Sequence, residues 1–151
     1  MVLDSTGIKL TNRGEWLNKK YGKKRRKGWI KVHVALDINS GKVLDMKVTY
    51  NRTHDSQCAI KLVENSIRKA EAEGRKVKEV IADTGYDTHK IFRHLAERKI
   101  KPVIKDGGDA VITGNRARDE VVRAIRGGKK KWREANGYGM FLSGSVGMLV
   151  S

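Results

Sequence analysis

The sequence predicts an α/β domain in which helices pack on a mixed β-sheet. Apolar residues alternate with a period of two through residues 30–50, which is typical of strands. From residue 59 onward they recur at spacings of three and four, which is typical of amphipathic helices. The chain has 151 residues, of which 38% are hydrophobic. That is enough for one packed domain and too little for two ordinary ones.

The first part of the chain predicts three strands that form an antiparallel meander. Residues 2–8 predict a short strand, and the polar, basic residues 9–28 predict a long connecting loop. Residues 30–38 predict a half-buried strand, joined by a turn at residues 39–42 to another strand over residues 43–50. One face of this hairpin should lie against the core, namely Ile30, Val32, Val34, Leu36 and Ile38 with Leu44, Met46 and Val48.

Helical spacing and cap residues predict three helices in the rest of the chain. Apolar positions over residues 59–70 define the first, with cap candidates at residues 53–56 and a terminating Gly74. Thr88 can cap the second, and residues 117–126 predict the third. Each of these helices should pack an apolar face against the sheet.

Two short apolar runs alternate with these helices and predict buried strands. They cover residues 77–82 and residues 102–104, where Pro102 takes the first position, at which a missing N–H donor is tolerated. Strands joined by helical crossovers run parallel to a neighbour in the sheet. The expected sheet therefore combines an antiparallel three-stranded meander with parallel strands.

The charge of the chain predicts an anionic partner. Lys and Arg number 33 and Asp and Glu 17, which gives a formal net charge of +16. Nucleic acid is the leading candidate, because neutralising phosphates releases counterions. A second basic stretch runs over residues 116–133. The alternative to nucleic-acid contact is that these basic residues form solvated loops. The densest cluster lacks acids and includes Tyr21 and Trp29, which could stack on bases; its cations are Lys19, Lys20, Lys23, Lys24, Arg25, Arg26, Lys27 and Lys31.

Composition excludes several other classes of protein. No stretch approaches ~18 consecutive apolar residues, which excludes a membrane-spanning helix. No apolar segment with a cleavage site opens the sequence, so export is not expected. The single cysteine, Cys58, excludes an internal disulfide framework and a Cys-rich zinc site.

Two aspartates are the candidate catalytic residues. Asp4 and Asp83 each follow a short apolar run and precede a polar turn. If their strands are neighbours, the carboxylates meet at one edge of the sheet, where a divalent cation would relieve their repulsion. The alternative is that each Asp only caps a turn. Asp37 and Asp45 are interpreted as structural, and residues 54–56 as the capping start of a helix rather than a catalytic pair.

The residues around these aspartates resemble a known family, the DDE-type transposases of bacterial and archaeal insertion sequences. The resemblance covers residues 2–139 and implies a ribonuclease H-like fold. It implies that Asp4 and Asp83 bind Mg²⁺ or Mn²⁺, which activates water or a 3′-hydroxyl to attack a phosphodiester. The segments that carry it are Asp4-Ser5-Thr6-Gly7, Asn51-Arg52-Thr53-His54-Asp55-Ser56 and Ile81-Ala82-Asp83-Thr84-Gly85-Tyr86-Asp87.

The sequence departs from the family pattern where the third acid is expected. Aligning Tyr138 with the Tyr of that pattern puts Phe141 at the Arg position and Ser145 at the Glu position. Residues 137–151 contain no charged residue, although 33% of the chain is charged. Glu120 and Glu134 lie nearby in sequence, but each sits among basic residues, so exposed ion pairing is the expected role of both.

These features predict a transposase catalytic-core fragment over residues 1–139, followed by a divergent uncharged tail over residues 140–151. Only three residues precede Asp4, so the region that such transposases use for end recognition is expected to be missing. The expected partners are transposon ends and target DNA, with a homodimer or a full-length transposase as a candidate protein partner. A cytoplasmic, nucleoid-associated location is expected.

The predicted function is metal-dependent DNA cleavage and strand transfer, impaired by the missing acid. A non-catalytic basic module that binds DNA or RNA is the alternative, because it needs the basic clusters and not the aspartates. A structural RNA-binding protein, such as a ribosomal component, would explain the charge. It offers no reason for the motif over residues 83–87.

Overall fold

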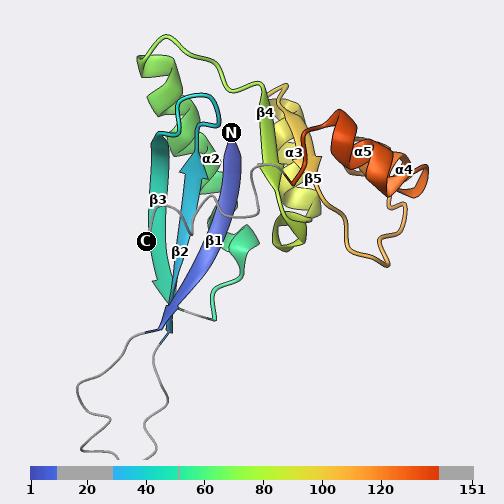
Figure 1. Cartoon of the computed structure of the whole chain (residues 1–151), viewed down its shortest axis with the longest axis horizontal. Coiled ribbons are helices and arrows are strands. Elements are labelled where there is room, and N and C mark those ends of the chain that lie inside the picture. The colour runs from blue at the N-terminus through green and yellow to red at the C-terminus, as the bar shows by residue number, and fades with distance from the viewer. Residues whose placement is uncertain (10–28, 51, 140–151) are drawn as a thin grey trace, which may run out of the picture.

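The computed structural model describes residues 1–9, 29–50 and 52–139. These residues form a five-stranded sheet with helices packed on it (Figure 1). In chain order the elements are β1 (Val2–Lys9), β2 (Trp29–Leu36), β3 (Val43–Tyr50), α2 (Asp55–Ala72), β4 (Glu79–Ala82), the 3₁₀ turn η1 (Thr84–Tyr86), α3 (His89–Glu97), β5 (Lys101–Ile104), α4 (Arg116–Arg126) and α5 (Lys129–Ala135).

The sheet is mixed, as the sequence predicts. Its strand order is β3-β2-β1-β4-β5, so the first strand lies at the centre (Figure 1). β1 pairs antiparallel with β2, which pairs antiparallel with β3. β4 runs parallel to both β1 and β5. A three-stranded meander extended by two parallel strands is the ribonuclease H-like arrangement that the resemblance implies.

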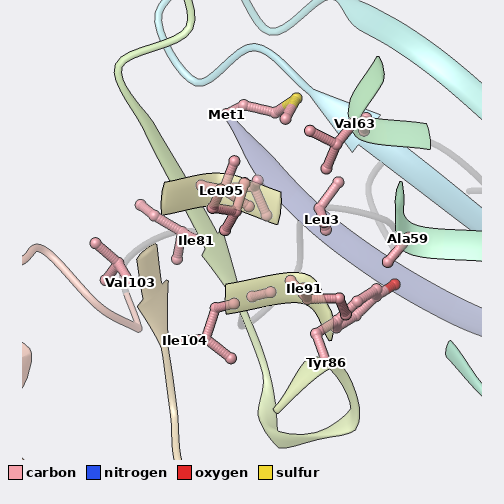
Figure 2. Packing of buried hydrophobic residues seen from close by; sticks show 14 of the residues in the cluster. Met1, Leu3, Ala59, Val63, Ile81, Tyr86, Ile91, Leu95, Val103 and Ile104 are labelled. Carbon is pink, nitrogen blue, oxygen red and sulfur yellow. The ribbon is translucent and has the colours of Figure 1, made fainter. Parts of the chain in front are cut away.

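The core lies between the sheet and helices α2 and α3. Leu3 from the central strand is fully buried and lies near Ala59 and Val63 of α2 and Leu95 of α3 (Figure 2). Tyr86 is also fully buried, and it is the last residue of the turn η1 that follows β4. Among the described residues, no helix combines the length and apolar character needed to cross a membrane.

Two predictions about strand faces are wrong in part. β2 was expected to be half-buried, but His33 and Ala35 on its second face are as inaccessible as its first face. A strand with neighbours on both sides and α2 against it has little exposed surface. Met46 and Val48 of β3 were expected in the core, but they are 59% and 53% exposed. β3 is an edge strand, and α2 packs on its other face, where Asp45 accepts a hydrogen bond from Asn65.

The helices agree with the sequence except for one that it did not predict. The expected caps are present: His54 precedes α2, Thr88 precedes α3, and the side chain of each accepts a backbone N–H. Helix α5 was missed because its Lys-rich sequence has no apolar periodicity, and only Trp132 is buried. The predicted loop over residues 9–28 lies almost wholly outside the described residues.

Candidate active site

Asp4 lies on β1, and Asp83 directly follows β4, the neighbouring parallel strand. Val2 pairs with Ile81 in the parallel β1–β4 register, and two residues further along each chain bring Asp4 next to Asp83. Neighbouring strands lie about 4.8 Å apart. Both aspartates line one hollow of about 440 Å³. The structure therefore brings together the two acids that the sequence singled out.

The two carboxylates have different settings. Contrary to the sequence prediction, Asp4 does not precede a turn but lies inside β1, which continues to Lys9. Its Oδ1 accepts a hydrogen bond from the Ser5 N–H at 2.8 Å. Asp83 follows the last residue of β4 and is exposed. Its Oδ1 caps the turn η1 by accepting the Gly85 N–H at 2.9 Å. Asp83 is therefore a turn-capping residue, as the alternative interpretation predicted, and it also faces the hollow.

The turn that carries Asp83 is fixed at several points. The Thr84 hydroxyl donates to the Asp106 carbonyl at 3.3 Å, which ties the turn to the loop after β5. Tyr86 anchors the turn in the core. Burial raises the pKa of the Tyr86 phenol above its ordinary value, and the charges of Asp55, Asp83 and Asp4 raise it further. All three carboxylates therefore lie near this side chain.

Asp87 closes the motif with a buried ion pair. Its two oxygens accept from Nε and Nη2 of Arg118, at 2.7 and 2.9 Å, in a bidentate arrangement. Oδ2 also accepts the Gly107 N–H at 3.2 Å. The exposed fractions of the two side chains are 7% and 9%, so this pair fixes the end of the motif to α4 in the interior.

The rim of the hollow is basic and comes from distant parts of the sequence. Lys105 follows β5, whereas Lys129 and Arg133 lie on α5. Lys129 and Arg133 are exposed. Three cations around two carboxylates suit a substrate that carries phosphate charge and approaches a bound cation. None of these three belongs to the densest basic cluster of the sequence, whose residues 19–27 lie outside the described part of the structure.

Tyr138 forms one wall of the hollow and is held by aromatic packing. Its ring lies 5.1 Å from that of Trp132, and the Arg133 guanidinium lies 5.9 Å from its centroid. The pKa of Tyr138 is raised to about 12, mainly by burial and also by the Asp83 charge, while Arg133 opposes the shift. The residue that matches the family's Tyr thus lies near the second acid.

The replacement acids considered from sequence do not reach this hollow. Glu120 is exposed and pairs with Arg116 at 3.1 Å, as expected. Glu134 is exposed and lines a neighbouring hollow with Lys129, Lys130 and Tyr138, rather than the one lined by Asp4. Ser145, at the family's Glu position, lies outside the described residues. Within them, no group of three or more His, Cys, Asp or Glu side chains is arranged to hold a metal ion.

The donor set nevertheless suits a hard divalent cation. Asp4 and Asp83 offer carboxylate oxygens in one solvent-accessible hollow. Mg²⁺ commonly binds through one or two carboxylates, with water and substrate phosphates completing its shell. No described His lines this hollow, so its carboxylate donors favour an oxygen-seeking ion rather than zinc.

Sequence reasoning singled out the two acids that line the hollow, and it missed the basic rim. Lys105 and Lys129 carry no motif, and each is one of many cations in the chain. Only Tyr138 offered a signal, through its place in the family pattern. The rim depends on the chain after β5, because residues of α5 line the same hollow as Asp83.

The fold and the paired acids place the chain among ribonuclease H-like α/β proteins. A family model described as the Transposase DDE domain matches residues 1–142, which is nearly the whole chain. The chain therefore belongs to the DDE transposase family. Membership links it to transposition, implies a DNA substrate and carries the family's general dependence on divalent metal ions. No solved structure matches it.

Proposed function

We propose that this chain is a DDE transposase core in which Asp4 and Asp83 hold a divalent cation for DNA strand cleavage and transfer. The observation that carries the proposal is that both aspartates line one hollow with a basic rim. Mg²⁺ or Mn²⁺, when bound, would activate an attacking oxygen and stabilise charge on the phosphodiester.

The protein's own groups would bind and orient the substrate around that cation. Lys105, Lys129 and Arg133, which line the same hollow, would contact phosphate oxygens of the DNA. The cap from Gly85 fixes one oxygen of Asp83, and Tyr86 keeps the turn seated in the core. Holding the reacting groups in this way contributes to rate by reducing the entropy lost on reaching the transition state.

The same proposal includes impaired catalysis. The family's third acid would sit at position 145, where this chain has Ser. A site with two carboxylates can hold a cation but lacks part of the clamp on the attacking and leaving oxygens. A second protomer or a full-length transposase is the proposed partner for supplying the missing acid.

Metal binding and DNA nicking test the proposal together. We expect Mn²⁺, followed by water-proton relaxation, to bind the full chain, and Asp4→Asn or Asp83→Asn to weaken binding by about tenfold or more. Asp45→Asn is the matched control, because Asp45 lies on the edge strand and accepts from Asn65 at 3.0 Å. Mn²⁺ binding that is equal in all four proteins would overturn the assigned site.

Nicking of supercoiled DNA should stay near background with Mg²⁺ or Mn²⁺. Clear nicking that disappears in Asp83→Asn would show that the site is right and the impairment is wrong.

The alternative is a non-catalytic nucleic-acid-binding module. It predicts nucleic-acid binding that falls steeply with salt and does not change in Asp4→Ala. It also predicts that the parent binds Mn²⁺ no more tightly than the double variant Asp4→Asn/Asp83→Asn.

A further inference from the structure

Asp55 is a third acid close to the motif turn, and the proposed mechanism does not use it. It begins α2, immediately after the cap residue His54. Its Oδ1 lies 2.7 Å from Lys31 Nζ and 3.4 Å from His33 Nδ1, both on β2. Only 13% of its side chain is exposed. An acid in the first turn suits the helix dipole, but that accounts for neither its burial nor its neighbours.

The contact that matters is with Gly85. A β-carbon added there would lie 2.8 Å from Asp55 Oδ2 and 3.0 Å from Asp83 Oδ1. The two carboxylates therefore both crowd the space that a side chain at this glycine would need. Gly85 is not in the left-handed region, so closeness rather than backbone conformation requires glycine here. Asp55 thus lies against the turn that bears Asp83, since α2 packs on η1.

The Asp55 carboxylate is itself held in place. His33 is fully buried, and its Nε2 lies 2.8 Å from the Thr49 hydroxyl on β3. Burial lowers the pKa of His33, Lys31 and Lys47 lower it further, and Asp55 opposes the shift. A neutral His33 leaves the Lys31 ammonium to balance the Asp55 charge. Two strands and a helix therefore fix the Asp55 carboxylate against the turn.

We propose that Asp55 is a positioning residue that holds the Thr84–Tyr86 turn so that Asp83 stays directed towards Asp4. The inference rests on the proposed function only in giving Asp83 a role, since the contact itself needs no metal. Asp55 is not among the residues that line the hollow, so it acts through Gly85 rather than as a ligand.

Hydrogen exchange at the Gly85 amide tests this inference without metal or DNA. That N–H donates to Asp83 Oδ1, so its protection reports whether the turn and the carboxylate remain together. We expect Asp55→Ala to speed exchange of this amide by about tenfold or more. The Ile81 N–H, which donates to the Met1 carbonyl at 2.9 Å, should keep its protection and exclude global unfolding.

Two more variants keep the test decisive if Asp55→Ala does not fold. Asp55→Asn preserves the shape and removes the charge that pairs with Lys31, and Lys31→Met removes the other partner. Both should speed exchange at Gly85 in the same direction, whereas the control Asp45→Asn should not. The inference would be overturned if protection at Gly85 stayed within twofold of the parent in every folded variant among Asp55→Ala, Asp55→Asn and Lys31→Met.

Mn²⁺ binding separates this inference from the proposed function. If the parent chain binds Mn²⁺, we expect Asp55→Asn to weaken binding severalfold, less than Asp83→Asn does. If the parent binds none but Gly85 exchange still depends on Asp55, the proposed metal site is wrong and the positioning role stands. If Mn²⁺ binding depends on Asp83 while Gly85 exchange ignores Asp55, the site stands and the positioning role is wrong.

Discussion

Each residue of the motif over residues 83–87 meets a different physical requirement. Asp83 caps the turn and faces the hollow, while Thr84 ties the turn to the loop after β5. Tyr86 supplies the buried anchor, and Asp87 pairs with Arg118. Gly85 provides the space that lets two carboxylates approach one backbone position. The motif is therefore a structural unit as well as a carrier of one acid.

The first prediction concerns the space around Gly85. Gly85→Ala should destabilise the protein by about 1–3 kcal/mol, because its methyl group would overlap Asp55 Oδ2 and Asp83 Oδ1. Urea unfolding followed by circular dichroism measures the loss. Gly108→Ala is the matched control, because an added β-carbon there meets nothing within 4 Å and Gly108 has no positive φ. Equal stability of the two variants would contradict the close packing around Gly85.

At the scale of elements, the start of α4 is braced by side chains on both sides. The Asn115 side chain caps the helix by accepting the Arg118 N–H, while Arg118 reaches back to Asp87. Asp119 accepts the Thr113 N–H at 3.0 Å and the Gly114 N–H at 2.8 Å. These contacts tie the loop before α4 to the helix, and α4 in turn packs on β5.

The second prediction is a pH dependence at this helix start. Burial acts to raise the pKa of Asp119, but the hydrogen bonds from Thr113 and Gly114 outweigh it and hold the pKa below its usual range. A depressed pKa gives stability that is present above about pH 4 and is lost as the pH falls through the folded value. The difference in unfolding free energy between the parent and Asp119→Asn should therefore be largest near pH 7 and shrink below about pH 4.

Urea unfolding at several pH values measures this difference. Asp109→Asn serves as the control, because Asp109 is an exposed acid a few residues before the same helix. Its substitution should change stability by no more than about 0.5 kcal/mol across the range. If the difference in unfolding free energy between the parent and Asp119→Asn stayed constant from pH 7 to pH 3, the assigned hydrogen bonds would be contradicted.

At the scale of the whole molecule, the positions of the cations matter for DNA binding as well as the net charge. The net charge of +16 attracts any polyanion, but only some cations border the acids. Lys105 and Lys129 line the hollow with Asp4 and Asp83. Lys76 and Lys78 line a different hollow near Met1, where β1 and β4 begin. The two pairs have the same formal charge and different surroundings.

The third prediction uses this contrast. Lys105→Gln/Lys129→Gln should weaken DNA binding and reduce the dependence of log K on log salt by up to about 2, because each lost phosphate contact removes close to one counterion. Lys76→Gln/Lys78→Gln carries the same charge change and should leave the slope nearly unchanged. Fluorescence anisotropy with a short duplex at several salt concentrations measures both. Equal slopes for the two variants would mean that binding depends on total charge alone.

Local patterns in the sequence predicted most of the elements. Period-two alternation predicted β2 and β3, helical spacing with capping residues predicted α2 and α3, and residues 117–126 were predicted to form the helix found as α4. These patterns are local because side-chain direction follows backbone geometry within a few residues. Helix α5 was not predicted because its Lys-rich sequence has a single buried residue, Trp132, and so no apolar periodicity.

The sequence by itself determined the excess of positive charge, the α/β order of elements and the two acids worth testing. Only the tertiary structure decided which groups surround those acids. The β1–β4 pairing brings positions 4 and 83 together, and the return of α5 places cations at the same hollow. Asp55 reaches Gly85 because α2 packs against the turn η1. Contacts between residues far apart in the chain depend on sheet order and helix packing, which no short window of sequence encodes.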